Sequence, residues 1–166
     1  MADANLLVTF DPTHIESAKK EISERMKDLK EKGKILKIEE GLAEMKVSDS
    51  RKVIKALTKL SKKESNFQYT KKWIPIDKWC SAKVPDMQKC IKSAIKDLKA
   101  KDKWKMDLGK HRADVHDMET IIKLTSVIEN KNVDLEKPDK IIKVEIVEKK
   151  AGIALLNKDD LLNVSK

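Results

Sequence analysis

The sequence contains few of the residues that secreted and membrane proteins depend on. Its 166 residues include only two cysteines, Cys80 and Cys90. No uncharged apolar run is long enough to cross a bilayer, and the start MADANLLVTF lacks the basic residues and long apolar stretch of a signal peptide. Two cysteines without a secretory signal favour free, packed thiols in a reducing compartment. We therefore expect a cytoplasmic protein.

Residue patterns typical of enzymes are also missing. The four glycines are too far apart to build a phosphate-binding loop. A zinc deaminase would need His-x-Glu and Pro-Cys-x-x-Cys, whereas the two cysteines here are separated by ten positions. His116 and Glu119 could share one helix face, but a single pair of this kind more often reflects capping or solvation than a metal site. The sequence predicts no catalytic residue, no metal and no cofactor, so we expect that the chain is not an enzyme.

Lysine, by contrast, is abundant and unevenly distributed. The net charge is +9, and residues 71–112 hold 13 Lys or Arg against 5 Asp or Glu. Nearly all of the positive excess therefore lies in one quarter of the chain, which favours a polyanionic partner over a merely soluble surface. Lysines outnumber arginines by 34 to 3. Because lysine contacts phosphate as a point charge, this composition suits an RNA backbone better than base edges.

The first half of the chain has the periodicities of a small α/β unit. Apolar residues of 15–29 recur every three or four positions, as in an amphipathic helix that follows a short strand at 6–10. Asp11 and Pro12 are suited to the start of this helix. The order strand, helix, strand, strand, helix, strand predicts a ferredoxin-like domain over residues 1–75. The remaining expected elements are strands at 34–40 and 42–48, a helix at 49–63 and a strand at 66–74.

The second half, residues 76–166, predicts another α/β domain. Its elements are a helix at 84–101, a half-buried strand at 103–108, a helix at 117–130 with an apolar stripe from Met118 to Ile128, and strands at 141–147 and 151–157. Trp73, Trp79 and Trp104 could stack on unpaired bases. Each falls in an apolar pattern or beside Pro75, so we expect them to pack in the interior. The chain is thus an α/β protein of two domains.

A basic triplet, Lys110, His111 and Arg112, stands where the 103–108 strand gives way to the next helix, in the stretch LGKHRADVHDMET. Arg112 could hold a phosphate with its planar guanidinium, and His111 adds charge only when protonated. The triplet follows two lysines on the polar side of the preceding strand. The residues that we expect to contact RNA are Lys71, Lys72, Lys103, Lys105, Lys110, His111 and Arg112.

The run VDLEKPDKIIKVEIVEKKAGIALLN, from Val133 to Asn157, resembles the closing segment of the THUMP domain. Upstream, WKMDLGKHRADVHDMETIIKLTSVIE is similar to the basic strand, turn and helix of that family, and the preceding ferredoxin-like domain matches the usual N-terminal partner of THUMP domains. The resemblance covers nearly the whole chain. One departure is His111, because relatives often carry an unbroken Lys/Arg cluster at this turn.

The resemblance implies a role in tRNA modification. THUMP domains bind the acceptor stem and 3′ end of tRNA, and a chain with only these two domains resembles the adaptor that assists N4-acetylcytidine formation. We therefore expect a monomeric adaptor that presents tRNA to a separate tRNA cytidine acetyltransferase. The alternative is a protein-interaction or ligand-sensing ferredoxin-like module that does not bind RNA. In that alternative the C-terminal tail NKDDLLNVSK could dock a partner through Leu161, Leu162 and Val164.

Overall fold

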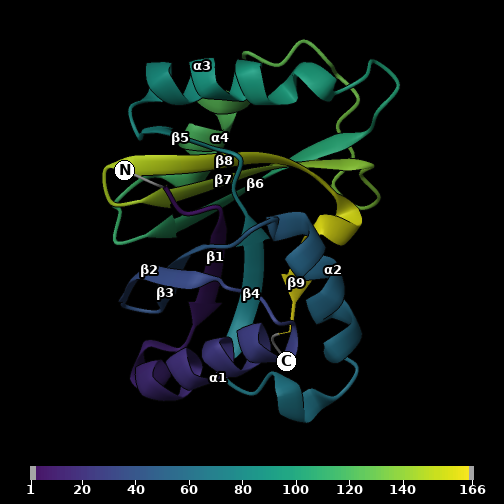
Figure 1. Ribbon diagram of the computed structural model, residues 1–166. Helices are drawn as coiled ribbons and strands as arrows, with labels where there is room; N and C mark the ends of the chain where they lie inside the picture. The colour runs from purple at the N-terminus through teal and green to yellow at the C-terminus, as the bar shows by residue number, and fades with distance from the viewer. Residues whose placement is uncertain (1–2, 165–166) are drawn as a thin grey trace. The chain divides into compact units, whose positions relative to one another are not determined.

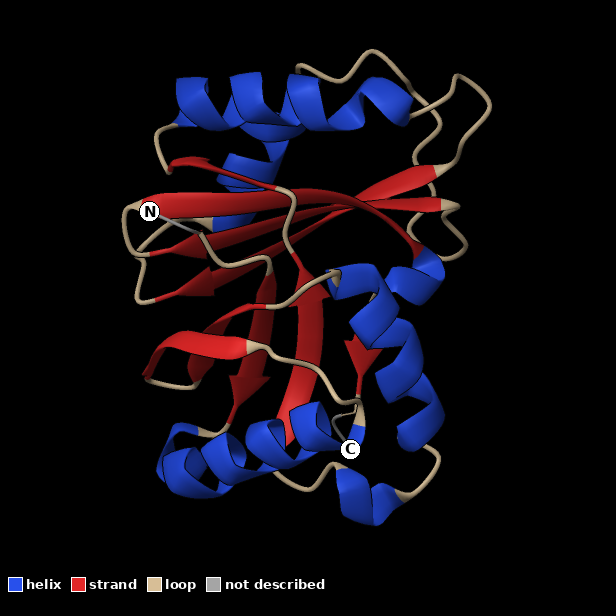
Figure 2. Cartoon of the chain, in the orientation of Figure 1, coloured by secondary structure: helices blue, strands red, loops and turns tan. Residues whose placement is uncertain are grey.

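The computed structural model describes residues 3–164, which form two compact α/β units (Figures 1 and 2). The first unit runs to Ile76 and takes in the chain again from Asp159, and the second spans Asp77–Lys158. Within the described residues no helix is long and apolar enough to cross a membrane.

The first unit is the expected ferredoxin-like arrangement. Its sheet has the strand order β2-β3-β1-β4-β9, in which all pairs are antiparallel. Helices α1 and α2 pack on the same face of this sheet, since both contribute to one apolar core with β1 (Figure 1). The elements are β1 (Leu6–Phe10), α1 (Ile15–Asp28), β2 (Lys34–Glu39), β3 (Leu42–Lys46), α2 (Ser50–Leu60), β4 (Thr70–Pro75) and β9 (Leu162–Asn163).

Local signals in the sequence account for most of these boundaries. Asp11 accepts a hydrogen bond from the backbone N–H of Thr13 and caps a short 3-10 turn that leads into α1, and Asp49 caps α2. The hairpin between β2 and β3 turns at Glu40 and Gly41, both with positive φ, as a two-residue hairpin requires. Helix α1 ends at Asp28, because Lys30, two residues later, adopts the left-handed conformation.

The C-terminal tail belongs to the first unit, which differs from the expected division into 1–75 and 76–166. Leu162 is buried and pairs with Trp73 of β4, and the Val164 N–H donates to the Lys71 carbonyl. Asp160 is buried and lies 3.6 Å from the Arg51 guanidinium. Of the three apolar side chains that could have docked a partner, Leu162 and Val164 therefore help complete the chain's own sheet and core.

The second unit is a four-stranded sheet covered on one face by two helices. The strand order is β5-β8-β7-β6, with β6 and β7 parallel and the other pairs antiparallel. Helices α3 and α4 share an apolar core with β7 and β8 (Figure 1). The elements are β5 (Lys78–Ser81), α3 (Val84–Ala94), β6 (Trp104–His111), α4 (Asp117–Thr125), β7 (Lys140–Val147) and β8 (Lys150–Asn157).

Three details of this unit differ from the expectations. The edge strand β5 was missed, and both helices are shorter than 84–101 and 117–130. The apolar stripe expected on α4 is wrong in part, because Met118 and Ile122 are 69% and 61% exposed. Thr120 and Leu124 face the interior instead. The expected strand 103–108 continues to His111, because its backbone stays in parallel register with β7.

The tail strand provides the first prediction. Truncating Leu162 to alanine should lower the free energy of unfolding by about 2–3 kcal/mol, since it leaves a cavity in the first unit's core. Chemical denaturation measures the change. The matched control is Leu36→Ala in β2, where the side chain is largely exposed and the effect should stay within about 0.5 kcal/mol. Equal effects at both positions would show that β9 is not part of the core.

Candidate nucleic-acid interface

The strand β6 presents alternating side chains to the two faces of its sheet. Met106 and Leu108 pack into the core beneath α3 and α4, so Lys105, Asp107 and His111 lie on the opposite face. β6 is an edge strand, paired with β7 alone among the strands of the described chain. The expected RNA-binding segment is therefore the edge of a sheet with one polar face.

A buried chain of charges crosses this polar face from β6 to β7. The Lys143 ammonium lies 2.9 Å from the Asp107 carboxylate and 2.9 Å from the Glu145 carboxylate. The other Glu145 oxygen lies 2.8 Å from His111 Nε2. Lys143 and Glu145 are almost fully buried, at 3% and 2% exposure. Because an ionised carboxylate can only accept, Nε2 must carry the hydrogen in this contact.

Gly109 makes room for this network. It lies directly opposite Glu145 in the parallel register of β6 and β7. A Cβ atom at position 109 would lie 2.1 Å from a Glu145 carboxylate oxygen. The glycine thus serves close packing of a buried side chain rather than a phosphate loop.

The network also sets the pKa values of its buried members. Burial alone would raise the pKa of Glu145, but the His111 hydrogen bond and the Lys143 ammonium together hold it below its usual value. Burial alone would lower the pKa of Lys143, but the Glu145 and Asp107 carboxylates raise it. Both groups are therefore charged at neutral pH. The polar face, which was expected to be basic, therefore carries both positive and negative side chains. Most of the charges in this network are balanced by a neighbouring charge of opposite sign.

The basic triplet, which the sequence predicts to contact RNA, lies at the end of β6 and in the turn that follows it. His111 belongs to the buried network, and Lys110 lies 3.0 Å from Asp117 at the start of α4. The Arg112 side chain is only 12% exposed and lies 2.9 Å from Glu148. Arg112 also has a positive φ of 51°, which turns the chain away from the strand. All three side chains therefore have acidic partners.

The two lysines before the triplet are more available to a ligand. Lys103 is exposed, and its ammonium lies 3.9 Å from Asp134. Lys105 is half-buried on the polar face, and within residues 3–164 it has no acidic partner within 4.0 Å. Hydrogen bonds to Asp139 fix the backbone of Lys103.

Lys71 and Lys72 lie in β4, in the first unit, and both are exposed. The Glu21 carboxylate of α1 accepts hydrogen bonds from the backbone N–H groups of Gln68 and Thr70, at 2.6 and 2.7 Å, and so fixes the start of this strand. The two lysines are therefore in a different unit from the basic triplet.

The tryptophans separate into two kinds. Trp73 and Trp104 are buried, as expected, and their indole N–H groups donate to Thr70 and to the Asn130 carbonyl. Trp79 is different, because it is half-buried in the edge strand β5 and the Lys150 ammonium lies 4.4 Å from its ring centroid. Trp79 is thus partly accessible rather than interior.

The two cysteines are free, and their thiols lie close enough to hydrogen-bond each other between β5 and α3. Burial, followed by the neighbouring Cys90, raises the pKa of Cys80 to about 12, and burial also raises the pKa of Cys90. Thiols with raised pKa values are protonated at neutral pH and are poor nucleophiles. Among the described residues no three His, Cys, Asp or Glu side chains form a group able to hold a metal ion.

Sequence reasoning missed the network of charges that His111 joins. Asp107, Lys143 and Glu145 occupy alternate strand positions, which normally indicates a solvated face. Two features of the sequence could have indicated the network: residues of opposite charge on two otherwise apolar strands, and a glycine within β6. Neither feature shows which charged side chains pair with each other unless the register of the two strands is known.

Comparison by sequence gives no relative: no protein-family profile matches the chain, and no curated protein is significantly similar. Comparison by structure does give proteins of similar fold. PH1313 from Pyrococcus horikoshii matches with 16% identity and a TM-score of 0.62, over 93% of this chain and 54% of that one. TrmN from Thermus thermophilus matches with 10% identity and a TM-score of 0.57, over 90% and 44%.

A third similar structure is a 4-thiouridine synthetase crystallised with RNA and ATP. It has 16% identity and a TM-score of 0.58, over 98% of this chain and 42% of the synthetase. The chain thus spans about half, or somewhat less, of each of these proteins. At such identities the likeness concerns the fold, and it supports the expected ferredoxin-like unit followed by a THUMP-type α/β unit.

The close contact at Gly109 predicts a large effect of a small substitution. Gly109→Ala should destabilise the second unit by roughly 3 kcal/mol, because the added methyl group displaces the Glu145 carboxylate and breaks a buried ionic network. Chemical denaturation measures the loss. The control is the same substitution in a Glu145→Ala background, where most of the cost should disappear. Additive losses would mean that the glycine does not act through Glu145.

The lowered pKa of Glu145 predicts a pH dependence of stability. The folded chain binds this proton less readily than the unfolded chain, so the stabilisation is complete above the usual glutamate value of 4.5 and is lost as pH falls through the folded value. Unfolding free energies measured from pH 6 to pH 3 should fall less steeply for Glu145→Gln. The exposed control Glu136→Gln should keep the wild-type slope, and an unchanged slope for Glu145→Gln would exclude the linkage.

Proposed function

We propose that the chain binds the acceptor stem and 3′ end of tRNA and presents the tRNA to a separate cytidine acetyltransferase for N4-acetylcytidine formation. The observation that carries the proposal is the shared two-unit architecture. It extends over 98% of this chain in a 4-thiouridine synthetase crystallised with RNA, and over 90% in TrmN. The THUMP-like segment from Val133 to Asn157 agrees with this architecture.

The charge distribution supports the same function. The positive excess of residues 71–112 falls on lysines that are exposed or half-exposed on β4, α3 and the start of β6. Such side chains contact phosphates without reading sequence, which suits a protein that holds many tRNAs by their common end. Lys110 and Arg112 contribute in this proposal after exchanging Asp117 and Glu148 for phosphate oxygens.

Chemistry is assigned to the partner in this proposal. The Cys80 and Cys90 thiols have raised pKa values and His111 is hydrogen-bonded to Glu145, so none of these three side chains is an activated nucleophile or a free base. The acetyl donor and the energy for its transfer would come from the acetyltransferase, and the contribution of this chain would be to position the tRNA.

A gel-shift titration tests the proposal directly. Binding of tRNA with and without its 3′-terminal single strand should differ, and affinity should fall steeply with salt as counterions are released. A protein-interaction module would retain no tRNA at low salt. That outcome would refute RNA binding and leave the alternative function standing.

Mutation of Lys103 and Lys105 tests the proposed RNA binding at single side chains. The Lys103→Ala/Lys105→Ala double variant should bind every tRNA more weakly, and the plot of log affinity against log salt should flatten by about two units. The matched control is Lys19→Ala/Lys20→Ala on the solvent side of α1, where Lys20 lies 4.0 Å from Glu24. Equal salt slopes for wild type and the 103/105 variant would remove this strand from the interface.

A further inference from the structure

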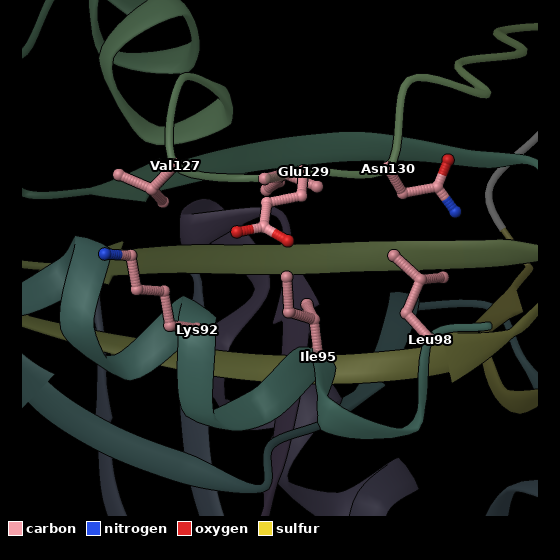
Figure 3. Close-up of a pocket in the computed structure, with 7 residues that line it drawn as sticks. Lys92, Ile95, Leu98, Val127, Glu129 and Asn130 are labelled. Atoms are coloured by element: carbon pink, nitrogen blue, oxygen red, sulfur yellow. The ribbon is translucent and has the colours of Figure 1, made fainter. Parts of the chain in front are cut away.

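A groove lies between α3 with its following 3-10 turn (Ile95–Asp97) and the segment after α4. It encloses about 340 Å³. Figure 3 shows Lys92, Ile95 and Leu98 on one side and Val127 and Glu129 on the other, with the Glu129 carboxylate directed into the space between them. The apolar walls are formed by Ile95, Leu98, Val127 and Ile128.

The groove contains two opposite charges that do not pair with each other. Within residues 3–164 neither Lys92 nor Glu129 makes an ion pair or a side-chain hydrogen bond. The neighbouring Asn130 amide, in contrast, is fully used: it donates to the Lys99 and Asp102 carbonyls and accepts from the Asn132 N–H. The groove therefore offers one cation, one carboxylate acceptor and an apolar wall.

Lys92 is also the middle member of a row on the outer side of the helix. Lys89, Lys92 and Lys96 follow at spacings of three and four, are exposed, and span about 10 Å. Within the described chain none of them has an acidic partner. Two exposed lysines on other helices do have one: Lys20 of α1 lies 4.0 Å from Glu24, and Lys123 of α4 lies 3.1 Å from Glu119.

We propose that this groove binds one unpaired nucleotide of RNA, with neighbouring phosphates on the Lys89, Lys92 and Lys96 row. The base would lie against the apolar wall, and its exocyclic amino group would donate to Glu129. This inference rests on the proposed function and adds to it a site, a ligand class and a base preference. A nucleotide fits because it carries an anion and a hydrogen-bond donor at separate points of one small ligand.

Glu129 also determines which bases fit. Cytosine and adenine present an amino group that a carboxylate can accept from, whereas uracil presents a carbonyl oxygen at the same edge. Opposing a carboxylate and a carbonyl oxygen is unfavourable. The site should therefore favour cytosine or adenine over uracil.

The experiment measures fluorescence anisotropy of labelled oligo(C), oligo(A) and oligo(U) of equal length with the full chain. Wild type should bind oligo(C) or oligo(A) about five- to tenfold more tightly than oligo(U), as one charge-assisted contact allows. Glu129→Gln should reduce this ratio severalfold while affinity for tRNA changes little. A ratio near one for wild type, or an unchanged ratio for Glu129→Gln, would overturn the base site.

The phosphate row has a matched control elsewhere in the chain. Lys52, Lys55 and Lys59 on α2 have the same spacing and are also exposed. Lys89→Ala/Lys92→Ala/Lys96→Ala should weaken all three oligomers about tenfold or more and flatten the salt slope by two to three units. The Lys52→Ala/Lys55→Ala/Lys59→Ala variant of α2 should reduce affinity and salt slope much less. Equal losses of affinity in the two triple variants would show nonspecific electrostatic attraction instead of a binding site.

The two proposals fail in different ways. If wild type retains no tRNA at low salt, the proposed function itself fails. If tRNA binds normally but the oligomers show no base ratio and the two triple variants are equivalent, only the groove is refuted. Tighter binding of an acidic peptide than of oligo(C) at equal charge would identify a protein ligand and also refute the nucleotide site.

Discussion

The buried carboxylate of Glu145 is the constraint on which the second unit's polar face depends. It is 2% exposed, so its charge must be compensated within the protein, and Lys143 and His111 compensate it at 2.9 and 2.8 Å. Gly109 must lack a side chain for the carboxylate to fit. The Glu145 carboxylate therefore constrains three features of strand β6 at once: its register with β7, the glycine at position 109 and the histidine at its end. The turn at Arg112 follows directly after this constrained histidine.

This constraint changes where positive charge is available for a ligand. Four of the seven expected RNA-binding residues lie within 4.0 Å of a carboxylate, and lysines without an acidic partner in the described chain include those at the start of β6, on β4 and along α3. An unpaired lysine can contact a phosphate at lower cost than a paired one, because the paired side chain must first lose its internal partner. The proposed tRNA-binding role is consistent with this division.

The sequence predicted those features that are encoded locally. The order of strands and helices, the apolar stripe of α1, and Asp11 and Pro12 before it all led to the ferredoxin-like unit. Features that depend on distant partners were not accessible: the return of Leu162 to β4, the exposure of Met118, and the acids that pair with the triplet. Each of these depends on which segments meet in space, and no short window of sequence carries that information. The groove beside Lys92 belongs to the same class.

The central claim is that the unpaired lysines of the chain hold tRNA. Ultraviolet cross-linking of the chain to tRNA at low salt, followed by mass spectrometry of the cross-linked peptides, tests it most directly. The account predicts cross-links in peptides from residues 71–112 and 127–130, and few from the outer face of α1, where lysine and glutamate alternate. Cross-links confined to α1, or none at all under conditions in which tRNA is saturated with protein, would contradict it.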